Sequence, residues 1–135
     1  MAYECTVPLT QLEGSTDYKN KYDGKYHCVA LVQKGSGGCS NAPLVGQWKR
    51  GVKVLDSKVQ LPQGTIIATF DEEGKYPISN RHAAIYVSHD ANSITVYDQW
   101  IGQDKVLKRD IRKRPGNITE KTRDVNDADY YYVVE

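Results

Sequence analysis

Two strand-like segments joined by a very short turn constrain the fold of this chain more than any other feature. Residues 81–88 and 93–100 are rich in β-branched and aromatic side chains, and residues 89–92 between them contain Asp and Asn, which favour turns. A connection this short joins antiparallel neighbours, because parallel strands need a crossover of about a dozen residues or more. The two segments therefore predict a hairpin in an antiparallel sheet.

Three further segments are expected to extend this sheet. Residues 64–70 are apolar and rich in β-branched side chains, residues 106–112 alternate apolar with charged side chains, and residues 130–134 form a short apolar run. The polar stretch 113–127 is expected to be a loop. These patterns therefore predict antiparallel strands in the second half of the chain.

Helical signals lie before these strands. A first helix is expected over about residues 28–34, ending at the glycine-rich residues 35–38. A second short helix is expected over residues 41–51, with Leu44 and Trp48 four residues apart and facing the core together. Helices followed by antiparallel strands predict an α+β domain in which the first helix packs on the sheet.

Length and composition predict one domain. With 135 residues, of which 39% are hydrophobic, the chain can bury one core, and residues 1–135 are expected to form a single domain with residues 1–27 as an irregular arm. Lys and Arg number 18 against 17 Asp and Glu, so the net charge of +1 argues against nucleic acid as a partner. The first residues include neither a basic nor an apolar leader segment, and no apolar run is long enough to cross a bilayer. Neither a signal peptide nor membrane insertion is expected.

The chain has three cysteines, so at least one of them is unpaired. Cys28 is expected to be the free thiol, and a disulfide between Cys5 and Cys39 is compatible with this count. The cysteine and histidine spacings do not match a zinc site, so no metal and no cofactor are expected. Taken alone, Cys28 is a small buried side chain, since free cysteine is among the most buried residue types.

Cys28 and His82 together indicate nucleophilic chemistry. Cys28 begins the first predicted helix, where unpaired backbone N–H groups and the positive end of the helix dipole favour thiolate over thiol. His82 lies at the head of a predicted strand, where a rigid imidazole can exchange a proton with the nucleophile. A cysteine first on a helix and a histidine later on a strand is the chain order of papain-like amide hydrolases. We therefore expect cysteine-dependent amide cleavage.

The third catalytic position has two candidates on opposite faces of the segment 93–100. Side chains alternate across a strand, so Asp98 is expected on the face that meets His82 across the hairpin. Asp98 is the favoured group to orient the imidazole and stabilise the imidazolium. Gln99 is the alternative, because a bulge that shifts the register by one residue would exchange the two faces.

Other imidazole and charged side chains have local explanations. His27, beside Cys28, is either part of an oxyanion site or, as surface preferences favour, an exposed turn residue. His89 is expected to face solvent in the hairpin turn. Basic side chains recur from Lys105 to Arg114, and we interpret them as protecting an edge strand from aggregation rather than as a patch for an anionic substrate.

Five segments of the sequence occur in an order that matches a known group. They are residues 28–32, 42–51, 64–70, 82–86 and 98–100. Together, over roughly residues 20–112, they resemble the second family of type VI secretion amidase effectors, small NlpC/CHAP-like cysteine peptidases that cleave peptidoglycan peptides. Trp100 stands where the CHAP pattern has an amide, so the resemblance implies no fourth catalytic residue.

The resemblance implies a papain-like NlpC/CHAP-type fold in which N-terminal helices pack on an antiparallel sheet. It implies a hydrolase that uses Cys28, His82 and Asp98 to cleave a peptide bond in the stem or cross-link of Gram-negative peptidoglycan, such as the meso-diaminopimelate to D-alanine cross-link. It also implies an antibacterial toxin that is made in a bacterial cytoplasm, delivered by a type VI system into the periplasm of a target cell, and blocked in the producer by a cognate immunity protein.

Two alternative functions remain at this level. A cysteine protease or deamidase acting on proteins would use the same three side chains, and a non-catalytic wall-binding module would keep the scaffold with an unreactive Cys28.

Overall fold

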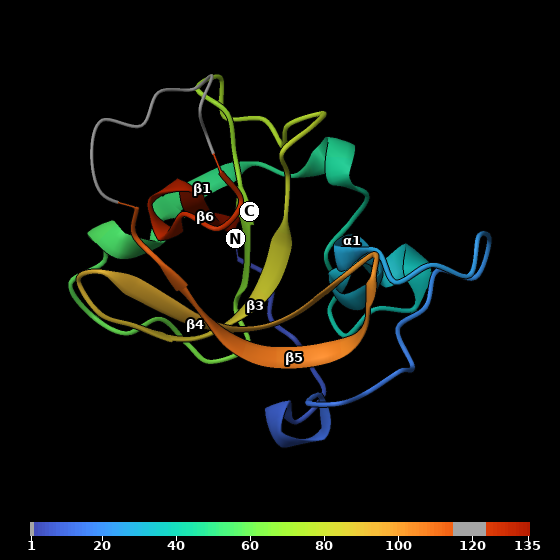
Figure 1. The fold of residues 1–135 in the computed structure, drawn as a ribbon. Coiled ribbons are helices and arrows are strands. Elements are labelled where there is room, and N and C mark those ends of the chain that lie inside the picture. Colours follow the sequence, from blue (N-terminus) through green and yellow to red (C-terminus); the bar gives the residue numbers. More distant parts are fainter. Residues whose placement is uncertain (1, 115–123) are drawn as a thin grey trace.

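An antiparallel β-sheet forms the body of the protein (Figure 1). The structure, a computed structural model, describes residues 2–114 and 124–135, and within these residues the sheet has six strands in the order β1-β6-β2-β3-β4-β5. The strands are β1 (Arg50–Lys53), β2 (Ile66–Thr69), β3 (Ala83–His89), β4 (Ser93–Trp100), β5 (Gln103–Arg112) and β6 (Tyr131–Val134). The strands expected in the second half of the chain are therefore present, whereas most of the predicted loop 113–127 lies outside the described residues.

The β3-β4 hairpin has the antiparallel pairing that its short turn predicts. His89 pairs with Ile94 beside the turn, and Tyr86 pairs with Val96 further along. The register shifts between Tyr86 and Ser88, which is the turn side of the hairpin. This shift changes the register at the other end of the hairpin by one residue. Without it, the pairing would continue with Asp98 opposite Ile85, whereas Ile85 pairs with Tyr97.

Helices make up a small part of the structure. The α-helix of the described residues is α1 (Cys28–Val32), which is shorter than expected. A 3-10 turn at Lys34–Ser36 follows it and ends at Gly37, whose φ of 77° lies in the left-handed region that favours glycine. Further 3-10 turns span Leu9–Gln11, Val45–Gln47, Val54–Asp56 and Ala128–Tyr130. The helical part of the expected α+β domain is therefore α1 with short turns, and the structure is mostly antiparallel sheet.

The prediction of a second helix over residues 41–51 is wrong. A 3-10 turn at Val45–Gln47 occupies its centre, and β1 begins before its predicted end. Trp48 is buried as expected, but Leu44 is 63% exposed, so the two side chains do not face the core together.

Pairing with the end of the chain explains why this segment is extended. Lys49 and Glu135 exchange backbone hydrogen bonds of 2.6 and 2.8 Å, which a helix would not allow. Gly51 marks a close approach between strands rather than a helix stop, since a Cβ atom there would lie 2.8 Å from the carbonyl oxygen of Val133. These partners are more than eighty residues away in sequence, so no local pattern predicts them.

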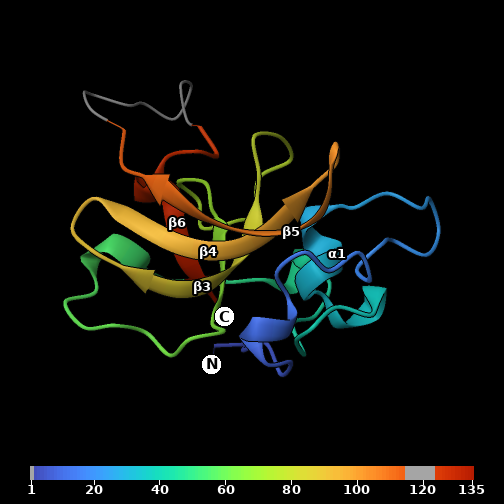
Figure 2. The ribbon, with the colours of Figure 1, turned by 60° about the horizontal axis from the view of Figure 1, so that its bottom comes forward.

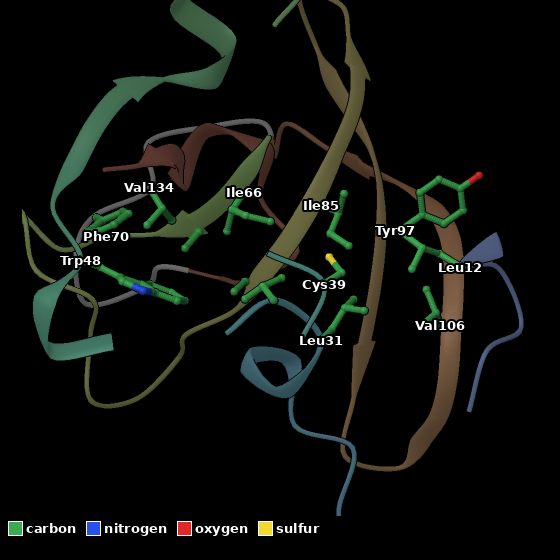
Figure 3. Close-up of a cluster of buried hydrophobic side chains, with 13 residues drawn as sticks. Leu12, Leu31, Cys39, Trp48, Ile66, Phe70, Ile85, Tyr97, Val106 and Val134 are labelled. Atoms are coloured by element: carbon green, nitrogen blue, oxygen red, sulfur yellow. The ribbon is translucent and has the colours of Figure 1, made fainter. Parts of the chain in front are cut away.

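Apolar side chains cover both faces of the sheet. α1 and the N-terminal arm pack against a first cluster, part of which is drawn in Figure 3; its buried members include Leu12, Leu31, Ile66, Ile85, Tyr97 and Val106. A second cluster includes Ile67, Ala84, Tyr86, Ile94, Val96 and Tyr131. Neighbouring residues of β3 and of β4 belong to different clusters, as the alternation of side chains along a strand requires. The side chain of Asp98 therefore lies on the face of the second cluster, and that of Gln99 on the face of the first.

The N-terminal arm is irregular, as expected, and is attached to the body of the protein. Glu4 forms an isolated bridge with Thr65, next to β2, and Leu12 is completely buried in the first cluster. Figure 2 shows the arm, in blue, on the same side of the sheet as α1. The arm therefore completes the core beneath the helix that begins at Cys28.

A disulfide joins Cys5 of the arm to Cys39, and Cys28 is the free cysteine. The backbone N–H of Thr6 donates to the Cys39 carbonyl at 2.7 Å, and the N–H of Cys39 donates to the Leu31 carbonyl of α1 at 2.7 Å. The bridge therefore links the arm to the helix through one short set of contacts.

Candidate active site

Cys28 is half-buried at the first position of α1. Ala30, Leu31 and Val32 are completely buried and anchor the helix on the sheet, so the position of the thiol follows from the packing of the residues after it. The Cys28 Sγ atom lies 3.7 Å from the hydroxyl of Tyr76 and contacts the imidazole of His82. A reactive side chain on a rigid, packed support is the arrangement that nucleophilic chemistry requires.

His82 lies one residue before β3 and contacts two of the candidate side chains. Its Nε2 atom is 2.7 Å from Oδ2 of Asp98, and both side chains are buried. Since Nε2 is engaged by Asp98, Nδ1 is the ring nitrogen left for Cys28. The three side chains that the sequence singled out thus form a continuous set, Cys28 to His82 to Asp98, across the end of the sheet.

The electrostatics of this set favour charge separation between cysteine and histidine. Burial disfavours the thiolate, but the hydrogen bond and charge of His82 outweigh it and lower the pKa of Cys28 below its ordinary value. Burial also disfavours the imidazolium, but hydrogen bonds to Asp98 and Cys28 raise the pKa of His82 to about 9. A whole charge on a neighbouring ring is a larger effect than the half charge at the end of the five-residue α1. Both shifts favour a thiolate and an imidazolium at neutral pH.

Arg109 of β5 is the second partner of the Asp98 carboxylate. Its Nε donates to both carboxylate oxygens at 3.0 and 2.8 Å, and its Nη2 lies 2.7 Å from Oδ2. Burial disfavours the carboxylate, but the hydrogen bonds from His82 and Arg109 hold the pKa of Asp98 below its usual range. The guanidinium also lies 4.9 Å from the ring centre of Trp100. Arg109 therefore keeps Asp98 ionised and fixes the direction in which it meets His82.

Gln99 lies on the other face of β4 and does not share the position of Asp98. Its Nε2 donates to the carbonyls of Tyr18 at 2.7 Å and His27 at 3.0 Å. The His82 ring is bonded to Asp98, so the register favours the first of the two candidates for the orienting group. Gln99 instead supports the residue that precedes Cys28.

Tyr76 is a site residue that the sequence reasoning missed. It lies in the irregular segment between β2 and β3, and its ring packs edge-on against Trp48 at 4.9 Å and Phe70 at 6.5 Å between centroids. Burial, together with the neighbouring Cys28, raises the pKa of the Tyr76 hydroxyl well above its ordinary value. A neutral hydroxyl therefore points at the nucleophile. No periodic pattern surrounds Tyr76 in sequence, so only the path of the loop reveals it.

Two cavities meet at His82. One, of about 230 Å³, lies on the Cys28 side, and the other, of about 320 Å³, lies on the Arg109 side. Arg81, His82 and Trp100 line both of them. Together they form a cleft on either side of His82, whose ring is buried between Cys28 and Asp98. Arg81 and Trp100 were not assigned to the site from sequence.

The other two histidines differ in their surroundings. His27 lines the cleft beside Cys28, and its Nε2 lies 2.7 Å from the exposed carboxylate of Asp23. His89 does not simply face solvent, as expected for a turn residue: its Nδ1 lies 2.6 Å from the Tyr86 hydroxyl and its Nε2 lies 2.9 Å from the Ser57 carbonyl oxygen. Local bonds therefore account for both rings.

The basic run along β5 separates into one site residue and several surface residues. β5 is an edge strand of the sheet, in agreement with the interpretation as a charged edge. Arg109 is the exception, because its pairing with Val96 places it diagonally beside Asp98 on the same face. Alternation along β5 assigns Arg109 to one face of the strand, and the β4-β5 register is what links it to Asp98.

The described residues offer no group of three or more His, Cys, Asp or Glu side chains arranged to hold a metal ion. In the same part of the chain, the helices are too short or too polar to traverse a lipid bilayer.

The fold and the site define a class of protein, the amidase effectors. A solved structure described as type 6 secretion amidase effector 2 (Tae2) matches this structure with a TM-score of 0.75 and 29% sequence identity. The match covers 97% of this chain and 93% of that chain. Amidase effectors hydrolyse amide bonds, which agrees with a cleft built around a cysteine and a histidine.

The family follows from the sequence comparison. Residues 3–134 match the family described as domesticated amidase effector 2 (Dae2), and the chain belongs to this family. A relative from Ixodes scapularis named domesticated amidase effector 2 is 35% identical over 111 residues, which are 82% of this chain and 72% of that protein. The resemblance to the second family of type VI secretion amidase effectors is thereby confirmed.

Proposed function

We propose that this protein is a cysteine-dependent amidase that cleaves a peptide bond in the stem or cross-link of bacterial peptidoglycan. The observation that carries the proposal is the set of Cys28, His82 and Asp98, in which the thiol contacts the imidazole and the imidazole is 2.7 Å from the buried carboxylate. A cysteine at a helix start and a histidine at a strand start also support the papain-like NlpC/CHAP relationship inferred from sequence.

The proposed mechanism is acyl transfer. The Cys28 thiolate attacks the scissile carbonyl, and a thioester forms as the C–N bond breaks and the His82 imidazolium gives its proton to the leaving amine. His82 then takes a proton from water, whose oxygen attacks the thioester; the C–S bond breaks, and the acid product leaves while the Cys28 thiolate and the His82 imidazolium are restored. Asp98 keeps the imidazole in the tautomer and orientation that both steps need.

The Tyr76 hydroxyl is the side-chain donor to the developing oxyanion in this mechanism. It lies 3.7 Å from Cys28 Sγ, which is the region where the carbonyl oxygen of a thiol adduct must lie. The backbone N–H of Cys28 is the second donor, since the first residues of a helix leave their N–H groups without helical partners.

Tyr76→Phe is expected to lower kcat by about 10²-fold with little change in KM, because one oxyanion donor is lost while the ring still packs on Trp48 and Phe70. Steady-state kinetics on a released muropeptide would measure both constants. If the variant retained at least half of the wild-type kcat, the hydroxyl would have no such role.

The pH dependence is expected to follow the two perturbed groups. Activity needs the Cys28 thiolate and the His82 imidazolium together, so kcat/KM should fall on the alkaline side with a midpoint near the His82 pKa of about 9. On the acid side kcat/KM should also fall, with a midpoint at a pH below the ordinary pKa of a cysteine, because the pKa of Cys28 is lowered. Asp98→Asn should retain partial activity and move the alkaline midpoint to lower pH, since the carboxylate raises the His82 pKa. An alkaline limb unchanged in this variant would contradict the assignment of Asp98.

The expected substrate is Gram-negative peptidoglycan, with the meso-diaminopimelate to D-alanine cross-link as the first bond to examine. Incubation with purified sacculi, followed by muramidase digestion and mass analysis of the muropeptides, tests this. Loss of cross-linked dimers or shortening of stems would support a wall amidase, and the fragment masses would identify the bond. An unchanged profile would contradict it and turn attention to protein substrates or to wall binding without catalysis.

The proposed site of action is outside the cytoplasm of the cell that makes the protein. Similarity to a type 6 secretion effector supports the delivery into the periplasm of a target cell that the sequence led us to expect, with a cognate immunity protein as partner. The Cys5–Cys39 disulfide is compatible with this, since disulfides persist in oxidising compartments such as the periplasm and the extracellular space.

A further inference from the structure

Arg81 stands at the junction of the two cavities that form the cleft. It is adjacent to His82 in sequence, it is exposed, and it lines both the cavity that contains Cys28 and the cavity that contains Arg109. Its guanidinium carbon lies 5.2 Å from the ring centre of Tyr76, whose hydroxyl is directed at the nucleophile. A group bound by Arg81 would therefore lie close to the reacting bond.

The guanidinium of Arg81 is free of any carboxylate partner among the residues that the structure describes. Its one protein hydrogen bond there is a long one of 3.4 Å from Nη1 to the Pro77 carbonyl. Two other basic side chains of the cleft differ from it: Arg109 is engaged by both oxygens of Asp98, and the His27 ring lies 2.7 Å from the Asp23 carboxylate. Arg81 is thus the cation in the cleft that has its hydrogen-bond donors available for a ligand.

We propose that Arg81 binds a carboxylate of the substrate next to the scissile amide and makes the enzyme selective for peptides that carry this charge. The proposal rests on the proposed function. A guanidinium presents paired N–H donors that match a carboxylate with two parallel hydrogen bonds. Stacking on Tyr76 limits the positions of the guanidinium before substrate arrives, so less freedom is lost on binding. Peptidoglycan stem peptides carry free carboxylates, and conversion of these groups to primary amides removes the charge with almost no change in shape.

The test compares two forms of one substrate. A cross-linked muropeptide dimer that wild type cleaves is used with its free carboxylates and with the same carboxylates converted to primary amides. Wild type is expected to cleave the carboxylate form with a kcat/KM about 10- to 100-fold higher, as the loss of charge-assisted hydrogen bonds predicts. Arg81→Gln is expected to lose this preference, mainly through a higher KM for the carboxylate form. Arg81→Lys should fall between them, because it keeps the charge without the paired donors.

Arg50 offers a matched control. Its guanidinium carbon lies 5.3 Å from the ring centre of Tyr132, so Arg50→Gln also removes an arginine stacked on a tyrosine, but Arg50 lines neither cavity of the cleft. This variant should keep the wild-type preference. The rate of Cys28 alkylation should be the same in wild type and in both glutamine variants, which shows that the nucleophile is intact.

The outcomes separate this inference from the function on which it rests. Equal cleavage of the two dimers by wild type, or a preference that persists in Arg81→Gln, would overturn the carboxylate site and leave the amidase in place. A fall in kcat on both dimers alike in Arg81→Gln would also overturn it, because Arg81 would then act by supporting Tyr76. Failure of wild type to cleave any muropeptide, together with an unreactive Cys28, would overturn both proposals.

Discussion

Cys28→Ala is expected to lower amide cleavage by about 10⁴-fold or more, because the variant lacks the atom that forms the thioester and cannot use His82 without it. The free energy of unfolding should change by no more than about 1 kcal/mol, since Cys28 is half-buried and α1 is anchored by the buried residues that follow it. Muropeptide release from sacculi would measure the activity, and urea unfolding would measure the stability. Turnover close to that of wild type would exclude Cys28 as the nucleophile.

The cysteine count makes a second readout available for the same variant. The chain has three cysteines, and the disulfide occupies two of them, so a thiol reagent applied to the folded protein reports on Cys28 alone. Wild type should react with iodoacetamide faster at neutral pH than a denatured control, because the Cys28 pKa is lowered. A rate no faster than that of the control would favour the non-catalytic alternative.

Removal of the Cys5–Cys39 bridge is expected to lower the free energy of unfolding by about 4 kcal/mol, the loop-closure value for cysteines 34 residues apart. This is a large part of the ~5–15 kcal/mol that is usual for a domain. The measurement is urea unfolding of a Cys5→Ser/Cys28→Ala/Cys39→Ser variant against Cys28→Ala, so that neither protein contains a free thiol when unfolded.

The position of the bridge predicts a consequence for the site as well. Cys39 bonds to the backbone of α1 at Leu31, so loosening the arm should also loosen the helix that carries the nucleophile. Cys5→Ser/Cys39→Ser should therefore lose activity at a lower urea concentration than wild type. If the free energy of unfolding fell by less than about 1 kcal/mol, the backbone hydrogen bonds and buried side chains of the arm would be sufficient to attach it without the disulfide.

The two strands of the β3-β4 hairpin could be derived from local patterns. The alternation of apolar side chains along 81–88 and 93–100, with a short turn between them, is sufficient to predict β3 and β4. Their register at the end away from the turn depends on the shift between Tyr86 and Ser88, which local patterns do not reveal. That register is the reason that Asp98, rather than Gln99, meets His82. The meeting of Asp98 with His82 was therefore expected from alternation but is decided by this shift, and their catalytic role stays a prediction.

Other parts of the site depend on contacts that local patterns do not contain. Tyr76 lies in a segment without periodicity, and its place beside Cys28 follows from packing on Trp48 and Phe70. Arg109 could be linked to Asp98 only through the β4-β5 pairing, and it appears in sequence as one of several edge charges. Arg81 is recognised as a site residue only because it lines both cavities of the cleft.

Residues 41–51 illustrate the same division in the fold. Their helix-like spacing of Leu44 and Trp48 is a weak local preference, and strand pairing with β6 overrides it through backbone hydrogen bonds to the last residues of the chain. Side-chain alternation and turn chemistry act over a few residues and can be recognised without a structure. Strand order, the disulfide partner of Cys5 and the cleft around His82 join segments far apart along the chain, so they exist only once the packing of the whole sheet has brought those segments together.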